Sequence, residues 1–223
     1  MNKGQQADLE WRDGVPISRM FNDPYFSLDD GLAETIYVFL DGNDLPGRFV
    51  DGFHIGELGF GTGLNLLATW QAWTKSQSLG TLQFTSFEAY PMAPDDMARA
   101  LAVYPTLADL SDQLIEAMRK GSSFQTDTLT FNCVVGDARD TLPQITDQMD
   151  AWFLDGFAPA QNPELWQPDL LNQVAIHTKP GGTFATYTAA GAVRRALGEA
   201  GFQVERRAGF GRKRHMSVGR MPS

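Results

Sequence analysis

The chain has 223 residues, of which 43% are hydrophobic and 20% are charged, a balance typical of a folded globular protein and not of a disordered one. A chain of this length buries enough apolar surface to fold without a cross-link, and its single cysteine, Cys133, excludes an internal disulfide. The net charge of −9 argues against general nucleic-acid binding, yet residues 191–223 carry eight basic and two acidic side chains. The basic end can therefore present one cationic face to phosphate.

Targeting and membrane-spanning signals are missing from the sequence. Residues 1–6 lack the apolar stretch of a signal peptide, and no uncharged apolar run approaches the ~18 residues of a membrane helix. Together with the single cysteine, this pattern favours a reducing, cytoplasmic location and no membrane partner.

From residue 53 onward the sequence alternates between strand-like and helix-like segments. Strands are predicted at 53–58, 82–88, 129–135, 151–155, 183–187, 202–206 and 215–218, and helices at 62–74, 163–178 and 190–200. This alternation predicts an α/β, Rossmann-like fold with a mostly parallel, seven-stranded sheet and helices on both faces.

Two segments do not follow this alternation of strands and helices. An N-terminal extension, residues 1–52, contains a turn-rich stretch and a predicted helix at about 30–40. A helical insertion at about 91–122 is predicted to hold two helices, with prolines at their starts. We therefore expect one domain, 1–223, in which the core spans 53–218.

The strongest motif, ELGFGTGLN at residues 57–65, lies between the first core strand and the next helix. Gly59, Gly61 and Gly63 permit a sharp turn and a close backbone approach to a ligand at a helix N-terminus. The spacing differs from the G-x-G-x-x-G of dinucleotide dehydrogenases, and an acid before the turn would repel a pyrophosphate. We expect Glu57 to hold the cationic amino group of S-adenosylmethionine, with Asn65 in the same cofactor site.

Acidic residues also end the next two core strands. Glu88 is predicted to accept hydrogen bonds from ribose hydroxyls, and Asp137, followed by Ala138, to accept one from the adenine amino group. Because the carboxyl ends of parallel strands meet at the edge of the sheet where ligands bind, these acids and Glu57 together predict a cofactor site for S-adenosylmethionine.

The strand at 151–155 ends in Asp155, which Gly-Phe-Ala-Pro follows. An acid or asparagine at this place lies beside the transferred methyl group in many amine methyltransferases, so Asp155 is the first candidate for catalysis and a neighbour of the cofactor. Phe157 is predicted as a catalytic residue beside Asp155, and Tyr25 is predicted to contact the cofactor. Either ring is expected to wall the acceptor base. The three histidines and Cys133 share no ligand spacing, so we expect no metal site.

Six blocks of sequence carry a resemblance to a known family. They are WRDGVPISR (11–19), DPYFS (23–27), DGLAETIYVFL (30–40), GFGTGLN (59–65), AWFLDGFAP (151–159) and GFGRKR (209–214). From about Asp8 to Val218, the chain is similar to the methyltransferase half of the bifunctional MnmC family of tRNA wobble-uridine modification enzymes. Ala89, Gln161 and His215 depart from that family's usual lysine, lysine and glutamate.

The resemblance implies a class I S-adenosylmethionine-dependent methyltransferase. It implies methyl transfer to the primary amine of 5-aminomethyl-(2-thio)uridine in the tRNA anticodon loop. The family's flavin-dependent oxidase half is absent from these 223 residues, so we expect a free-standing monomer with a separate oxidase as a partner.

A tRNA substrate fits the basic end, whose predicted phosphate contacts are Arg194, Arg195, Arg212, Lys213 and Arg214. Two alternatives stay open at this point. A methyltransferase of a small-molecule amine would keep the acidic cofactor site but need no basic end. A non-catalytic partner of a separate flavin oxidase would bind S-adenosylmethionine or tRNA without turnover.

Overall fold

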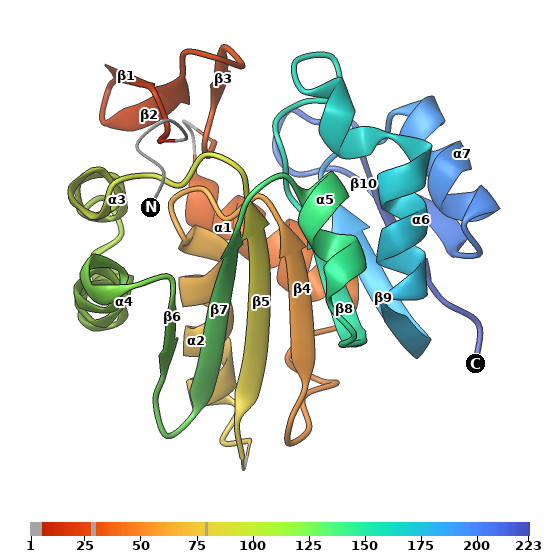
Figure 1. Cartoon of the computed structure of the whole chain (residues 1–223), viewed down its shortest axis with the longest axis horizontal. Helices are drawn as coiled ribbons and strands as arrows, with labels where there is room; N and C mark the ends of the chain where they lie inside the picture. Colours follow the sequence, from red (N-terminus) through yellow and green to blue (C-terminus); the bar gives the residue numbers. More distant parts are fainter. Residues whose placement is uncertain (1–5, 28–29, 79) are drawn as a thin grey trace.

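The computed structural model describes residues 6–27, 30–78 and 80–223, so residues 1–5 of the predicted extension lie outside the described part. A central sheet has the strand order β10-β11-β9-β8-β4-β5-β7-β6 (Figure 1). Its parallel strands are β4 (His54–Leu58), β5 (Leu82–Glu88), β7 (Leu129–Val135), β8 (Met149–Leu154) and β9 (Thr178–Thr186). The antiparallel strands β11 (His215–Arg220) and β10 (Gln203–Ala208) extend it on one side.

The prediction of seven strands was one strand short. An eighth, β6 (Ser123–Gln125), pairs antiparallel with β7 at the edge of the sheet. It has three residues, of which only Phe124 packs against the core, and three residues are too few for an alternation to reveal a strand. The seven predicted strands and the parallel arrangement of the central ones are confirmed, with shifted ends.

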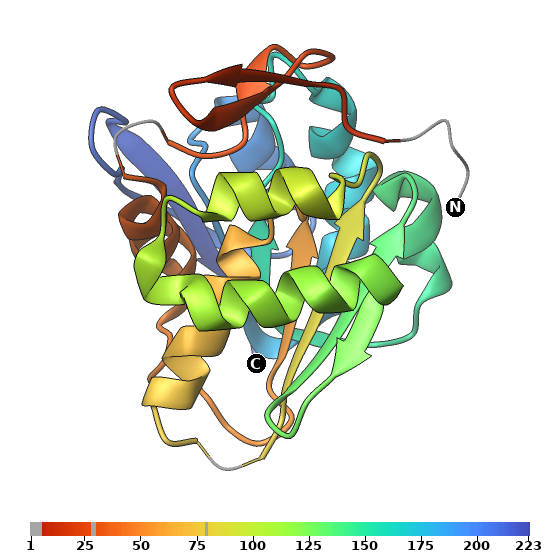
Figure 2. The ribbon, with the colours of Figure 1, turned by 90° about the vertical axis from the view of Figure 1, so that its left-hand side faces the viewer.

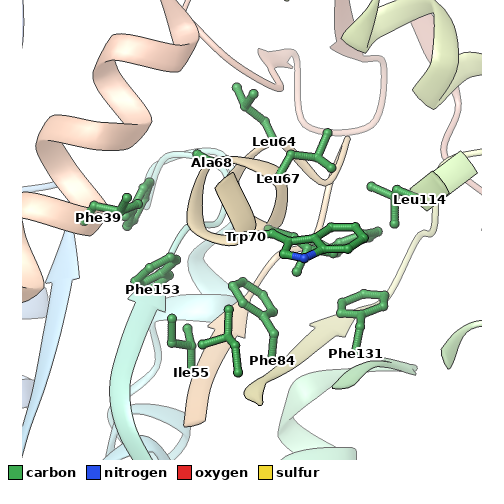
Figure 3. Close-up of a cluster of buried hydrophobic side chains, with 14 of the residues drawn as sticks. Phe39, Ile55, Leu64, Leu67, Ala68, Trp70, Phe84, Leu114, Phe131 and Phe153 are labelled. Carbon is green, nitrogen blue, oxygen red and sulfur yellow. The ribbon is translucent and has the colours of Figure 1, made fainter. Parts of the chain in front are cut away.

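Both faces of the sheet are buried, because successive side chains along a strand point to opposite sides. On β8, Ala151 and Phe153 belong to one hydrophobic cluster, while Trp152 and Leu154 belong to the other. Figure 3 shows the first cluster, in which Phe84 and Phe153 of the sheet lie opposite the helix that carries Leu67 and Trp70.

Helices cover these two faces (Figures 1 and 2). One face is covered by α2 (Leu64–Lys75) together with α3 (Pro94–Leu101) and α4 (Ala108–Lys120), the two helices predicted for the insertion. The other face is covered by α5 (Ala138–Thr141), α6 (Pro168–Ile176) and α7 (Gly191–Glu199). The four-residue α5 was not predicted, because one turn of helix is too short to show a period.

The N-terminal extension forms a small sheet of its own instead of only turns. Strands β1 (Leu9–Arg12), β2 (Val15–Ser18) and β3 (Asp23–Pro24) pair antiparallel and lie beyond the carboxyl ends of the core strands (Figure 2). The helix predicted at 30–40 begins as α1 (Gly31–Thr35) and continues as a π-helical turn at Ile36–Leu40. Asp23 accepts a hydrogen bond from the backbone N–H of Ala158 at 2.8 Å, which fastens the extension to the loop after β8.

Among the described helices, none combines the length and apolarity needed to cross a membrane.

Candidate functional site

A cleft of about 790 Å³ opens between the N-terminal sheet and the carboxyl ends of the core strands, a volume in the range of small-molecule sites. Most of the residues predicted for the site line it: Tyr25, Gly59, Gly61, Asn65, Glu88, Asp137, Ala138, Asp155, Phe157, Arg212 and Lys213. Glu57, Gly63, Arg194, Arg195 and Arg214 lie outside the lining.

The glycine-rich turn is held tightly between two other segments. Gly59 has φ +88°, and a Cβ there would overlap the backbone carbonyl oxygen of Asp155. Gly61 has φ +55°, and a Cβ there would lie 3.1 Å from the ring of Tyr25. Gly63 precedes α2 and faces the core, where a Cβ would meet Leu114. The first two glycines line the cleft, while the third faces the core.

Gly59→Ala is expected to lower the free energy of unfolding by about 2–4 kcal/mol, because it adds backbone strain to an overlap with the next loop. Chemical denaturation measures this loss. Gly198→Ala is the matched control, since a Cβ at Gly198 in α7 meets no atom within 4 Å. The control is expected to gain about 0.5 kcal/mol from helix propensity. If Gly59→Ala were as stable as the unaltered protein, the claim that the turn leaves no room for a Cβ at Gly59 would be wrong.

Glu88, at the end of β5, lies against the glycine-rich turn. Its carboxylate accepts hydrogen bonds from the backbone N–H groups of Gly61 at 3.0 Å and Tyr90 at 2.8 Å. Burial raises the pKa of this carboxyl, and the backbone hydrogen bonds oppose that shift. Glu88 therefore stands at the place where the sequence predicts an acceptor for ribose hydroxyls.

Asp137 has a partner within the chain. Its carboxylate caps α5 by accepting from the backbone N–H of Arg139 at 2.9 Å, and it also forms an ion pair with the Arg139 guanidinium at 2.6 Å. The hydrogen bond from Arg139 holds the pKa of Asp137 below its usual value. The expected hydrogen bond to an adenine amino group must therefore share this carboxylate with Arg139.

Glu57 lies outside the lining of the cleft, and its expected contact with the cofactor's amino group stays a prediction. Its side chain is completely buried, and its two oxygens accept from Asn65 Nδ2 at 2.9 Å and Ser86 Oγ at 2.6 Å. Burial raises its pKa well above the usual range. The sequence places this acid at the end of β4 but does not show that its side chain points beneath the turn.

Asp155 lines the cleft at the end of β8. Its Oδ2 accepts from Asn65 Nδ2 at 2.7 Å, and within the described residues this is the one hydrogen bond that the carboxylate receives. Burial raises the pKa of Asp155 to about 7, while Asn65 and Lys213 oppose the shift. A carboxyl group that titrates near neutrality in a cleft is suited to accept a proton from a bound ligand.

The loop after Asp155 uses its carbonyl groups to hold its own shape. The Gly156 carbonyl accepts from the Tyr187 hydroxyl at 2.8 Å, and the Phe157 carbonyl accepts from the Trp166 indole at 2.8 Å. The Ala158 carbonyl accepts from two backbone N–H groups, at 2.7 and 2.9 Å. These bonds give three carbonyl groups of the loop partners inside the protein, while the Asp155 carboxylate keeps capacity to accept from a ligand.

Aromatic side chains form one wall of the cleft. Phe157 stacks on Phe21 with 4.8 Å between ring centroids, and Tyr25 meets Phe157 edge-on at 5.0 Å. Tyr90 meets Phe21 at 5.9 Å. Burial raises the pKa of Tyr25, so its hydroxyl stays protonated at neutral pH. Such a wall offers apolar, flat surface to a planar ring.

Lys213 turns inward from the loop between β10 and β11. Its Nζ forms an ion pair with Glu34 of α1 at 2.7 Å and lies 4.2 Å from the centre of the Tyr187 ring. The Lys213 charge lowers the pKa of Asp155, whereas the Glu34 charge raises it. The lysine predicted to contact phosphate is therefore a part of the cleft.

Lys213→Met is expected to raise the pKa of Asp155 by about one unit, because it removes a nearby cation and leaves the Glu34 charge unpaired. Carbon-13 NMR of the aspartate carboxyl groups measures this titration without any substrate. Lys120→Met is the control, since Lys120 pairs with Glu116 on α4. An unchanged or lowered pKa in Lys213→Met would contradict the coupling.

The other basic side chains occupy different positions. Arg195 on α7 and Arg214 in the loop before β11 are exposed, while Arg194 is half-buried and donates to the Ala189 carbonyl at 3.3 Å. In the described part of the chain, no group of three or more His, Cys, Asp or Glu side chains is arranged to hold a metal ion.

The sequence-based prediction of the site does not include Phe21, Asp23, Glu34 and Tyr187, which are among the residues that line the cleft. Three of them come from the N-terminal extension, and Asp23 lies 135 residues before its partner Ala158. No local spacing signals such contacts. The one sign in the sequence is the crowding of aromatic residues in the extension, a pattern that is equally typical of core packing.

The chain is similar to a family of methyltransferases and to two known bacterial proteins. A family model described as S-adenosyl-L-methionine-dependent methyltransferase matches residues 104–222. The tRNA 5-methylaminomethyl-2-thiouridine biosynthesis bifunctional protein MnmC of Marinobacter nauticus is 44% identical over 98% of this chain, and the Stutzerimonas stutzeri protein of the same name is 45% identical over 98%. The chain spans 37% and 35% of their lengths.

The crystal structure of MNMC2 from Aquifex Aeolicus has a similar fold, with a TM-score of 0.81 and 23% sequence identity. The match covers 100% of this chain and 74% of that one.

The cleft fits the cofactor that the family model implies. The backbone lines it at Gly59 and Gly61, and Glu88 stands at the second strand end. The cofactor is S-adenosyl-L-methionine. The family model matches more than half of the residues of this chain. The chain therefore belongs to the S-adenosyl-L-methionine-dependent methyltransferases.

Proposed function

We propose that the protein methylates the primary amine of 5-aminomethyl-(2-thio)uridine at the tRNA wobble position, giving the 5-methylaminomethyl product. The similarity to two MnmC proteins over 98% of the chain is the observation that carries this proposal. Asp155, at the edge of an aromatic-walled cleft, supports it, because an amine acceptor needs a proton acceptor beside it.

The amine must be neutral before it can react. If its pKa were near that of lysine, freeing the lone pair at pH 7 would cost up to about 4.6 kcal/mol. S-adenosyl-L-methionine, when bound, supplies an electrophilic methyl group on a sulfonium. The protein's task is to hold the neutral amine in line with that group, which removes much of the entropic part of the barrier.

Asp155 is suited to orient and deprotonate this amine. Its carboxylate accepts one N–H from the protein, from Asn65, and has capacity to accept another from the substrate. The nitrogen gains a carbon and a positive charge as the carbon–sulfur bond breaks with its electron pair on sulfur. A group with a pKa of about 7 can take the proton that the nitrogen then releases.

The remaining parts of the cleft suit a nucleobase. Phe157 and Tyr25 provide the flat apolar wall, and a wobble base lies in a single-stranded loop where no duplex has to open. Arg194, Arg195, Arg212 and Arg214 are the phosphate contacts that we propose, on α7 and on the loop that also carries Lys213. The proposal includes a monomer in the cytoplasm and a separate flavin-dependent oxidase as a partner.

Methyl transfer from labelled S-adenosylmethionine into total tRNA tests the proposal, with tRNA from a strain that lacks the modification and nucleoside analysis of the product. The expected product is 5-methylaminomethyl-uridine, with or without the 2-thio group. If the protein binds S-adenosylmethionine but labels no tRNA, the acceptor is a small-molecule amine or the protein is a non-catalytic partner.

A further inference from the structure

The Asn65 side chain joins two carboxylates. Its Nδ2 donates to Glu57 Oε1 at 2.9 Å and to Asp155 Oδ2 at 2.7 Å. A side-chain amide has two N–H hydrogens, so these contacts use both of them. The amide can do this only while its nitrogen faces the two acids and its oxygen faces away.

Thr35, at the end of α1, satisfies the oxygen that faces away. Its Oγ1 donates to Asn65 Oδ1 at 3.0 Å, and both side chains are buried. A buried acceptor without a donor is costly, so removal of the hydroxyl would favour any state that gives Oδ1 a new donor. Protonated Asp155 is such a state, because a neutral carboxyl group can donate to the oxygen of a flipped amide.

We propose that Thr35 is a positioning residue for the catalytic carboxylate: by fixing the Asn65 amide, it keeps Asp155 ionised and ready to accept from the substrate amine. This inference rests on the proposed amine methylation. The described contacts give Thr35 no hydrogen bond to Asp155 itself, so it acts through Asn65.

Other titratable groups face Asp155 from the elements packed against it. They come from β4, α1, the N-terminal sheet, the strand end after β9 and the loop before β11: Glu57, Glu34, Asp23, Tyr187 and Lys213. Replacing Thr35 by valine changes none of these charges. A shift in the titration of Asp155 would therefore report the loss of the hydroxyl alone.

Thr35→Val and Thr35→Ser form the central test. The valine variant keeps the shape and loses the hydroxyl, and it is expected to raise the pKa of Asp155 by about one unit. In a pH profile of methyl transfer, its rate at pH 7 would then fall about fivefold and recover at high pH. Thr35→Ser, which keeps the hydroxyl, is expected to restore both readouts.

Thr69→Val is the matched control, since it also removes a buried hydroxyl, one that donates to the backbone carbonyl of Asn65 at 2.7 Å. It is expected to leave the titration of Asp155 unchanged. An unchanged pKa in Thr35→Val, an equal shift in Thr69→Val, or a loss of activity that high pH does not restore would each overturn the proposal. Thr35→Ala serves if the valine variant does not fold.

Carbon-13 NMR of the Asp155 carboxyl group separates this inference from the proposed function. The titration needs no acceptor, so it tests Thr35 even if tRNA is not methylated. An unaltered protein that labels no tRNA would refute the proposed function only.

Discussion

Asp155→Asn is expected to lower methyl transfer to tRNA by roughly 1000-fold, within the range for loss of a general base. Asparagine has nearly the same shape but cannot take up the proton that the amine releases. Its own N–H groups would also face the donor Nδ2 of Asn65 in one of the two amide orientations. Single-turnover transfer of a labelled methyl group measures the loss, and calorimetry measures the affinity for S-adenosylmethionine, which is expected to be largely retained.

The free energy of unfolding of Asp155→Asn shows whether the variant loses activity because it misfolds. The folded-state pKa of Asp155, about 7, exceeds the unfolded value of ~3.9, so its ionisation costs stability as the pH rises between these values. Asp155→Asn removes that cost and is expected to raise the free energy of unfolding at pH 8. Asp140→Asn, at an exposed site on α5, is the control for activity. Unchanged turnover in Asp155→Asn would refute the catalytic role.

The affinity for tRNA is expected to fall about 50-fold between roughly 50 and 200 mM salt, if the four arginines Arg194, Arg195, Arg212 and Arg214 contact phosphates of a single-stranded loop. Neutralising phosphates releases counterions, and this release becomes less favourable as the salt concentration rises. Filter binding or fluorescence anisotropy over a salt series measures the slope. A slope near zero would contradict phosphate contacts.

The double variant Arg195→Gln/Arg214→Gln is expected to reduce that slope by about 1.4, because two phosphate contacts are lost. Both side chains are exposed, so the fold should be unaffected. Lys75→Gln is the control: its ammonium, at the end of α2, donates to Gln71 on the same helix. An equal effect of the control would mean that net charge, not these arginines, sets the affinity for tRNA.

Much of the fold could be predicted from the sequence because parallel strands and their helices carry strong local patterns. The apolar run at 151–154 and the glycine-rich turn at 59–63 mark their elements without tertiary information. The strand β6 and the helix α5 could not be found this way, since each is four residues or fewer. The N-terminal sheet was missed because its strands are short and interrupted by turns.

The residues of the site also differ in whether the sequence alone could predict them. Glu88 and Asp155 were predictable because the ends of parallel strands meet at one edge of the sheet. The side-chain direction of Glu57 was not, since strand position alone does not tell whether an acid at the turn points into a cleft or beneath it. The ion pair between Glu34 and Lys213 joins residues 179 positions apart, so only the folded chain brings it to the site.

The most direct test uses two synthetic anticodon stem-loops that differ only at the wobble position, one with 5-aminomethyluridine and one with uridine. Each is incubated with the protein and S-adenosylmethionine, and the product nucleosides are identified by mass spectrometry. We expect one methyl group on the aminomethyl nitrogen of the first RNA and none on the second. Methylation of both RNAs, or of neither while a small-molecule amine is methylated, would contradict the proposed function.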